Sequence, residues 1–383
     1  MNQELYMIEK KLFDICRPKQ WKTIASSSLK KEGYPVYGAN GIIGFYDNYN
    51  HEKPTILITC RGATCGTINV SKPFSYINGN AMALDDLNEA EANIDYLAYY
   101  LKFRKLNDVI SGTAQPQITR EGLQSLKIPL PPLSEQKRIA QILDKADELR
   151  QKRQQSIEKL DELLQATFID MFGDPVTNPK GWKTKPLKEF ALKVQSGNTP
   201  KGGKENYLTE GIKFFRSQNV WKNKIIYDDI AFINEKTHQK MLGSSLKHKD
   251  ILMTKTGRIN TDNSSLGRAA IYLGEDDKAN LNGHVYLIRL NEKVNPFFIL
   301  SILTLPSYYE YIRSLCVGGI DKRQLNKEHI ENFSIIYPSI ELQDKFAKIK
   351  LNIEQQKEFL LKQLIKQENL FKSLQQRAFN GEL

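Results

Sequence analysis

The chain repeats one unusual passage, and this repetition constrains its fold more than any other feature. Residues 128–143 read IPLPPLSEQKRIAQIL, and residues 335–349, which begin 207 positions later, read IIYPSIELQDKFAKI. Each passage runs from an apolar, strand-like piece through proline into a long charged segment with regularly placed apolar residues. A chain of 383 residues has room for two or three domains, so a repeat of domain size is physically reasonable.

Other segments of the two halves match in the same order. The pairs are QWKTI (20–24) with GWKTK (181–185), PTILITCRGATCGTINV (54–70) with KDILMTKTGRIN (249–260) and SSLGRAAIYL (264–273), YINGNAMALD (76–85) with NLNGHVYLIRL (280–290), NIDYLAYYL (93–101) with NPFFILSIL (295–303), residues 111–133 with 317–340, and LLQATFIDMFGD (163–174) with LFKSLQQRAFNGEL (370–383). Extra residues occur mainly around 195–250. Six matches in one order indicate an internal duplication.

A long helix is predicted at the end of each half. The rows that recur every seven residues are Ile139, Ala146, Arg153, Leu160 and Thr167 with Leu143, Arg150, Ile157, Leu164 and Met171, and then Phe346, Ile353, Leu360, Gln367 and Leu374 with Lys350, Lys357, Leu364, Phe371 and Ala378. Heptad spacing of this kind predicts a coiled coil. Ser134 is a plausible N-cap, and Gly173 with Pro175 is a stop signal. The alternative is that each helix lies on its own globular domain, and the polar RQKRQQ (150–155) predicts looser packing there.

We therefore predict an α+β fold with two duplicated mixed α/β domains and two long antiparallel helices that form a coiled coil. The predicted boundaries are 1–132 and 174–338 for the domains, and 133–173 and 339–383 for the helices. A 38-residue helix is about 57 Å long. An antiparallel pair of such helices in a duplicated chain would place the two domains, or heads, about a pseudo-twofold axis. If the heads read DNA, they would meet one face of a duplex at sites roughly one helical turn or more apart.

Charge favours a polyanion as the partner. The net charge is +11, and residues 173–340 carry 25 Lys/Arg against 17 Asp/Glu. Basic side chains bind nucleic acid by neutralising phosphates and releasing counterions. A soluble protein that is merely basic remains the alternative reading of the charge alone.

The chain lacks motifs for chemistry of its own. There is no phosphate-binding G-x-x-x-x-G-K-[ST] loop, NPFF (295–298) has only one proline of an adenine-methyltransferase motif, and the five histidines are scattered. Cys60 and Cys65 have no second pair of cysteines, which argues against zinc. Four cysteines, no run of 18 apolar residues and no signal-peptide pattern at the N-terminus predict a cytoplasmic protein.

Three places in each half carry residues suited to DNA contact. Glycine lets the backbone approach phosphate, Arg and Lys reach phosphates or guanine, and Asn and Gln can bond adenine. The candidates are Arg61 and Gly62 with Lys255, Thr256, Gly257 and Arg258; Tyr37 and Asn40 with Arg216, Ser217, Gln218 and Asn219; and Gln115 and Gln117 with Lys322, Arg323 and Gln324. For any single residue, a role in a turn or on the surface is the alternative.

Over essentially its whole length, the chain resembles the specificity (S) subunit of Type I restriction–modification systems. The likeness rests on PLPPLSEQKRIAQILDKAD (129–147), LLQATFIDMFGDP (163–175), YPSIELQDKFAKI (337–349) and LFKSLQQRAFNGEL (370–383). YPVYGANGIIGFYD (34–47) and SGNTPKGGKENYLTEGIKFFRSQNVW (196–221) look like the openings of two groups of target recognition domain.

The resemblance implies that each domain reads one half of a split DNA target and that the helices set the spacer. It implies a non-catalytic chain that binds no cofactor or metal and docks two modification subunits, and optionally two restriction subunits. S-adenosylmethionine, ATP and Mg²⁺ are expected in those partners, and no membrane association is expected. The alternatives are a stand-alone DNA-binding regulator, an inactive recombined S allele and, least favoured by the missing motifs, a self-sufficient restriction enzyme.

Overall fold

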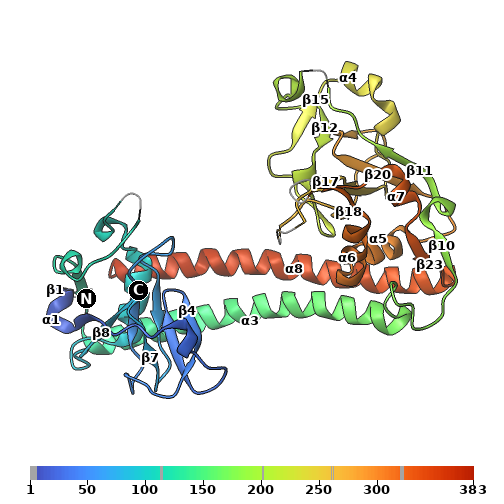
Figure 1. Ribbon diagram of the computed structural model, residues 1–383. Coiled ribbons are helices and arrows are strands. Elements are labelled where there is room, and N and C mark those ends of the chain that lie inside the picture. The colour runs from blue at the N-terminus through green and yellow to red at the C-terminus, as the bar shows by residue number, and fades with distance from the viewer. Residues whose placement is uncertain (1–6, 113–114, 201, 260, 262, 320–322) are drawn as a thin grey trace. The chain divides into compact units, whose positions relative to one another are not determined.

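The computed structural model describes residues 7–112, 115–200, 202–259, 261, 263–319 and 323–383. These residues divide into two compact units. The first comprises residues 1–155 and 360–383, and the second comprises residues 156–359. Each unit therefore combines a mixed domain with part of both long helices, α3 (Leu133–Phe172) and α8 (Ile340–Phe379), as the colours of Figure 1 show.

The first unit contains three small sheets. Its elements are β1 (Ile8–Lys11), α1 (Leu12–Ile15), β2 (Arg17–Gln20), β3 (Tyr34–Gly38), β4 (Gly41–Tyr46), β5 (Ile56–Thr59), β6 (Ile68–Val70), β7 (Tyr76–Ile77), β8 (Ala81–Asp85), α2 (Ile94–Arg104) and β9 (Lys127–Leu130). The sheet orders are β2-β8-β5-β6, β4-β3-β7 and β1-β9, and only β3 and β7 pair in parallel. The main core lies between the four-stranded sheet, α2 and the neighbouring parts of α3 and α8.

The second unit repeats this topology with additions. Its elements are β10 (Thr184–Pro186), β11 (Ala191–Ser196), β12 (Ile212–Phe215), β13 (Val220–Trp221), β14 (Lys224–Ile225), β15 (Ala231–Ile233), α4 (Glu235–Lys240), β16 (Ile251–Thr254), β17 (Thr256–Gly257), β18 (Ala269–Ile271), β19 (Ala279–Leu281), β20 (Val285–Leu290), α5 (Pro296–Thr304), α6 (Pro306–Leu315), β21 (Val317–Gly318), β22 (Arg323–Gln324), α7 (Lys327–Glu331) and β23 (Ser334–Ile336). The orders β11-β20-β16-β18, β15-β12-β19 and β10-β23 correspond strand for strand to the first unit. The predicted duplication is confirmed by this topology.

Equivalent hydrogen bonds fix the register of the repeat. The backbone N–H of Asn78 donates to Tyr37 over 2.9 Å, and that of Asn282 donates to Phe215 over 3.0 Å. Likewise, Leu12 N–H donates to Leu126 over 2.8 Å, and Leu187 N–H donates to Phe333 over 2.9 Å.

One sequence match was wrong. Residues 20–24 start at the last residue of β2, whose counterpart β11 begins only at Ala191, whereas residues 181–185 enter β10, the counterpart of β1. The resemblance of QWKTI to GWKTK is therefore a coincidence of five residues and not part of the repeat.

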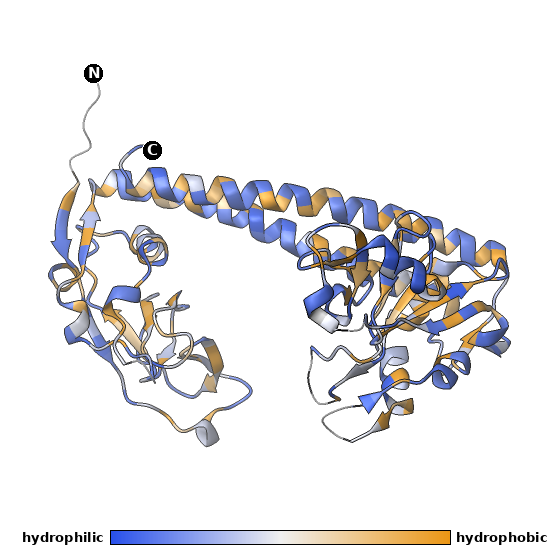
Figure 2. Cartoon of the chain, turned by 90° about the horizontal axis from the view of Figure 1, so that it is seen from above, coloured by the Kyte–Doolittle hydropathy of each residue, from blue (hydrophilic) through white to orange (hydrophobic). Residues whose placement is uncertain are grey.

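The two long helices run antiparallel in each unit. In the first unit, the Arg150 guanidinium lies 4.9 Å from the ring centre of Phe371, and Arg153 Nε donates to Gln367 Oε1 over 2.7 Å. In the second unit, the rings of Phe168 and Phe346 meet edge to face at 5.2 Å. Figure 2 shows apolar positions recurring along both helices, as the heptad rows predict. The predicted mixed α+β class with an antiparallel helix pair is confirmed.

Candidate nucleic-acid interface

In the first unit, the end of β5 meets the loop that leads to β9. Arg61 and Gln117 form a β-bridge, Gly62 N–H donates to the Pro116 carbonyl over 3.2 Å, and Ile118 N–H donates to the Cys60 carbonyl over 2.9 Å. The structure therefore brings together two of the predicted places. The side chains of Arg61, Gln115 and Gln117 are exposed. Gly62 has φ of +88°, a conformation that favours glycine.

The turn between β3 and β4 lies at the same edge. The hydroxyl of Thr59, the last residue of β5, donates to the carbonyl of Ala39, and the adjacent Asn40 is exposed. Tyr37 is different, because its ring is buried and its hydroxyl accepts a hydrogen bond from the backbone N–H of Lys72 over 3.1 Å. Asn40 is thus available to a ligand, whereas Tyr37 serves the core.

The second unit has the same arrangement at its corresponding edge. Strands β17 and β22 pair Thr256 with Gln324 and Gly257 with Arg323. Leu325 N–H donates to the Lys255 carbonyl over 2.9 Å, which is the counterpart of the bond between Ile118 and Cys60. Arg258 and Gln324 are exposed, and Lys322 lies outside the described residues. We call these two regions, around Arg61–Gln117 and Thr256–Gln324, the loop edges of the two units.

The second predicted place in this unit is mostly occupied by internal contacts. The Arg216 side chain is buried and paired with Asp229 at 3.1 Å, and Asn219 accepts from the Arg216 backbone N–H and donates to the Ile226 carbonyl. Gln218 is exposed, although it donates to Asp229 over 2.7 Å, and Ser217 is half-buried. Arg216 and Asn219 therefore hold a turn in place, and of this group only Gln218 and Ser217 could contact a ligand.

Cations at the loop edges lack carboxylate partners. Among the described residues, none of the four side chains Arg61, Lys255, Arg258 and Arg323 forms an ion pair with Asp or Glu. Lys255 lies 5.6 Å from the ring centre of Tyr286, and Arg323 Nε is buried with no hydrogen-bond partner in the described structure. Many other cations are paired, for example Arg289 with Asp250 at 2.7 Å and Arg104 with Asp108 at 2.7 Å. A bound anion would neutralise the positive charge of these four side chains.

Sequence reasoning missed residues that shape the loop edge of the second unit. A polar hollow of about 300 Å³ is lined by Thr256, Gly257, Arg258, Thr261, Asn263, Ser264 and Ser265. Arg268 is buried beside it and stacks on Trp221. One feature of the sequence could have drawn attention to Arg268. The repeat aligns it with the uncharged Thr67, and a charge at only one of two equivalent positions indicates that the two units differ there in function or packing.

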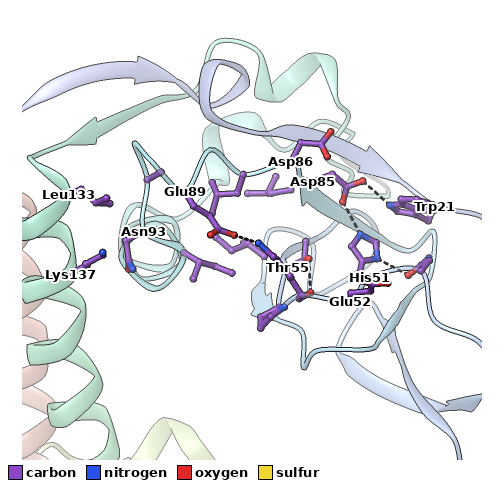
Figure 3. Close-up of a pocket in the computed structure, with 18 residues that line it drawn as sticks. Trp21, His51, Glu52, Thr55, Asp85, Asp86, Glu89, Asn93, Leu133 and Lys137 are labelled. Carbon is purple, nitrogen blue, oxygen red and sulfur yellow. Dashed lines mark hydrogen bonds and ion pairs between the residues drawn. The ribbon is translucent and has the colours of Figure 1, made fainter.

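A pocket of about 720 Å³ in the first unit contains several paired charges (Figure 3). His51 lies 2.9 Å from Asp85 through Nε2 and 2.7 Å from the Asn50 oxygen through Nδ1, and Trp21 Nε1 donates to Asp85 over 3.0 Å. Lys53 bonds to Glu89 and thereby lowers the pKa of that carboxyl. His51 with Asp85 and Lys53 with Glu89 thus bond to each other within the pocket.

The cysteines Cys16 and Cys60 are buried. Burial raises the pKa of Cys16 to about 12 and that of Cys60 to about 11, so both remain thiols at neutral pH. Within the described residues, no three His, Cys, Asp or Glu side chains are placed to hold a metal ion. The same part of the chain contains no helix that is both long and apolar enough to cross a membrane.

Comparisons with known proteins agree on one family. The family model for the Type I restriction modification DNA specificity domain matches residues 6–159 and 179–368. The MjaVIII specificity subunit of Methanocaldococcus jannaschii is 27% identical over 307 residues, which cover 76% of this chain and 70% of the relative. The EcoBI specificity subunit of Escherichia coli is 23% identical over 385 residues, which cover 92% and 75%.

Solved structures share the fold. The S subunit of a Type I restriction–modification system from M. genitalium superposes with a TM-score of 0.65 at 18% identity, covering 99% of this chain and 97% of that one. A chain from a structural study of type I complex assembly superposes with a TM-score of 0.53 at 16% identity, covering 98% of both. With two matched regions that together span most of its length, this chain belongs to the family of Type I restriction–modification DNA specificity proteins.

Proposed function

We propose that this chain is the non-catalytic specificity subunit of a Type I restriction–modification complex, and that each mixed domain reads one half of a split double-stranded DNA target. The observation that carries the proposal is the repeated loop edge. In both units, a glycine-containing loop after a central strand bonds to the loop before the last strand. Arg61 with Gln115 and Gln117 lies there in the first unit, and Lys255, Arg258 and Arg323 with Gln324 lie there in the second; none of these cations pairs with a carboxylate within the part of the chain that the structure describes. These are the groups that contact phosphates and base edges in DNA complexes.

The DNA contacts that we propose are narrower than the set predicted from sequence. They are Asn40, Arg61, Gly62, Gln115 and Gln117 in the first unit, and Ser217, Gln218, Lys255, Thr256, Arg258, Arg323 and Gln324 in the second, with Lys322 retained from the sequence alone. Tyr37, Arg216 and Asn219 are left out because their side chains are buried and bonded within the fold. Exposed polar groups can exchange water for DNA at much lower cost than buried ones.

The long helices suit partner docking. Exposed apolar side chains on them are Leu149, Leu361, Ile365 and Leu370 in the first unit, and Leu163, Ile169, Leu351 and Phe359 in the second. Exposed apolar surface on a helix pair favours contact with another protein. We propose that two modification subunits dock there and that restriction subunits can join. On this proposal, S-adenosylmethionine, ATP and Mg²⁺ belong to those partners, the complex works in the cytoplasm, and the helices set the spacer between half-sites.

Methylation-site sequencing tests the proposal directly. DNA is sequenced from cells that express this chain with a matching modification subunit, and from cells that express the modification subunit alone. We expect one new split motif, methylated at adenine on both strands, only when this chain is present. A stable complex that produces no new motif would indicate an inactive recombined allele. If no complex forms and the purified chain binds one DNA sequence tightly by itself, the stand-alone regulator is the better description.

A further inference from the structure

The loop edges of the two units differ in length. In the first unit, residues 60–65 connect Thr59 to Gly66, whose N–H donates to the Thr59 carbonyl over 2.9 Å. In the second unit, residues 255–266 connect the equivalent pair, Thr254 and Gly267, whose bond measures 3.1 Å. The second loop is therefore twice as long. A longer loop loses more conformational entropy when it is held in one shape, so it needs additional contacts.

Arg268 supplies such contacts. Its Nε donates to the Ser264 carbonyl over 2.8 Å, and its Nη2 donates to the Asn263 carbonyl. The side chain is buried and no carboxylate pairs with it among the described residues, and burial lowers the pKa of its guanidinium below its usual value. The equivalent residue in the first unit is Thr67, because Thr59 N–H bonds to Thr67 and Thr254 N–H bonds to Arg268 over the same 2.9 Å.

Trp221 gives the guanidinium a surface on which to lie. The carbon at the centre of the Arg268 guanidinium is 3.6 Å from the Trp221 ring centre, which is a close cation–π stack. Trp221 ends strand β13, and the turn that follows is fixed to β18 because Asn223 N–H donates to the Ala269 carbonyl over 2.8 Å. The support for Arg268 is therefore itself anchored to the sheet.

Helix α8 holds the same turn from the other side. Lys350 donates to the Asn223 side-chain oxygen over 3.1 Å, and the Asn223 amide donates to Glu354 over 3.0 Å. A continuous series of contacts thus leads, within the second unit, from α8 through Asn223 and Trp221 to Arg268. It ends at the carbonyls of Asn263 and Ser264, which line the polar hollow beside Arg258.

We propose that Arg268, stacked on Trp221, is a positioning residue for DNA recognition by the second domain, where it holds the long loop so that Arg258 and Thr256 can face the second half-site. This inference rests on the proposed function. It assigns Arg268 no contact with DNA, because the side chain is buried and its Nε and Nη2 donate to carbonyls of the loop. It also predicts that recognition of the first half-site is independent of Arg268, since the shorter loop has Thr67 at that position.

The test compares discrimination at the two half-sites. The complex of the full chain with its modification subunit is titrated with three duplexes: the motif found by sequencing, the motif with one base pair changed in the first half-site, and the motif changed in the second. The variants are Arg268→Gln, Arg268→Lys, Trp221→Leu and Trp221→Phe. Lys224→Gln is the matched control, because Lys224 is exposed in the same turn.

For Arg268→Gln and Trp221→Leu we expect at least a tenfold loss of discrimination at the second half-site and less than a twofold change at the first. Trp221→Phe should largely retain discrimination because it keeps an aromatic face, and Arg268→Lys should be intermediate because it keeps the charge but not the planar donors. Hydrogen exchange at the amides of residues 263–266 should quicken in the first two variants and not in Lys224→Gln.

Two results would overturn the inference. One is equal loss at both half-sites, which indicates general destabilisation. The other is unchanged discrimination and unchanged exchange in Arg268→Gln. If Arg268→Gln fails to fold, Trp221→Leu decides between these outcomes. Failure of the proposed function is distinguishable, because in that case the unmodified complex would itself select no DNA motif.

Discussion

At the scale of single residues, one buried glutamine joins each domain to the long helix that follows it. Gln136 accepts from the Asn93 backbone N–H over 2.8 Å and donates to the Pro131 carbonyl over 2.8 Å. Gln343 makes the same two bonds, with Asn295 and Pro338, each over 2.9 Å. The amide is suited to this position because one side chain must both accept and donate. The repeated Glu/Gln at the start of each helix is therefore a structural joint.

Replacing either glutamine with leucine should destabilise its unit. Gln136→Leu or Gln343→Leu leaves a partly buried N–H and a buried carbonyl without partners, at a cost of about 2–4 kcal/mol in unfolding free energy. Chemical denaturation followed by circular dichroism measures the change. Gln355→Leu is the control, since Gln355 is exposed on α8 and should change stability by less than about 0.5 kcal/mol. Equal effects of Gln343→Leu and Gln355→Leu would contradict this role.

Residue type alone could not separate exposed candidates for DNA contact from side chains with a structural role. Arg216 and Asn219 have the donors and acceptors expected of base readers, yet the structure uses them to close a turn around Asp229 and Ile226. Arg61 and Gln117 were predicted correctly to lie in exposed loops, but their pairing depends on a contact between segments far apart in the chain. Local sequence does not specify such contacts, so the sequence predicted the kind of residue and not its place.

At the scale of elements, the heptad rows predicted the helix pair because apolar side chains must repeat along a buried seam. Lys350 lies in one of those rows, at the position where the repeat has Leu143 in the first unit. Both side chains are buried, Leu143 completely and Lys350 with 3% of its surface exposed. Burial lowers the pKa of the Lys350 ammonium, although the nearby Glu354 partly opposes this effect. The second unit thus has a buried lysine at the position where the first unit has a core leucine.

Lys350→Leu should change how stability depends on pH. The pKa of Lys350 is lower in the folded state than its usual 10.5, so between these two values the unfolded chain binds more protons and stability rises with pH. The unmodified protein should therefore gain stability relative to Lys350→Leu as the pH increases towards 10.5, by at most about 1.4 kcal/mol per pH unit. Urea titrations at pH 7.5, 9 and 10 measure the difference, in which the cysteines and tyrosines common to both proteins cancel.

Lys348→Leu is the control for this prediction. Lys348 is exposed two positions earlier on α8, so its replacement should leave the pH dependence unchanged. Parallel stability curves for Lys350→Leu and the unmodified protein would show that the buried ammonium stays fully charged over this range.

The mismatch of QWKTI with GWKTK shows that a short sequence match does not establish that two segments occupy equivalent positions in the fold. Trp21 donates to Asp85 in the pocket of the first unit, whereas Trp182 donates to the Phe172 carbonyl at the end of α3. Five residues can match by chance, but a topological position is fixed by strand pairing. The longer matches, such as residues 54–70 with 249–273, span two paired strands and were correct.

At the scale of the whole molecule, the two units present the same backbone frame with different side chains. The first places Arg61 beside Gln117 and Gln115, and the second places Arg258 near Arg323 and Gln324. The second loop is twice as long as the first, and the stack of Arg268 on Trp221 has no equivalent among the described residues of the first unit, where Thr67 stands at the position of Arg268. A duplicated frame with divergent loops suits a split target whose halves differ in sequence. The target bases themselves depend on loop geometry that the sequence does not specify.

Single substitutions at the loop edges of the two units should therefore each affect a different half of the target. Arg61→Ala should weaken selection of the first half-site only, and Arg258→Ala that of the second, by about 1–3 kcal/mol if the guanidinium bonds a base. If it instead contacts a phosphate, affinity should fall for all sequences, and the slope of log K against log salt should become shallower by about 1. Titrations of the complex at three salt concentrations with the changed duplexes separate these two results.

Arg104→Ala is the matched control, because Arg104 is already paired with Asp108 and should affect neither half-site. The double variant Arg61→Ala/Arg258→Ala should lose the sum of the two single effects in free energy, since the two side chains belong to different units and share no partner in the described structure. Loss at both half-sites from either single variant would contradict independent reading by two domains. Additive losses, each confined to one half-site, would assign the halves of the target to the two units.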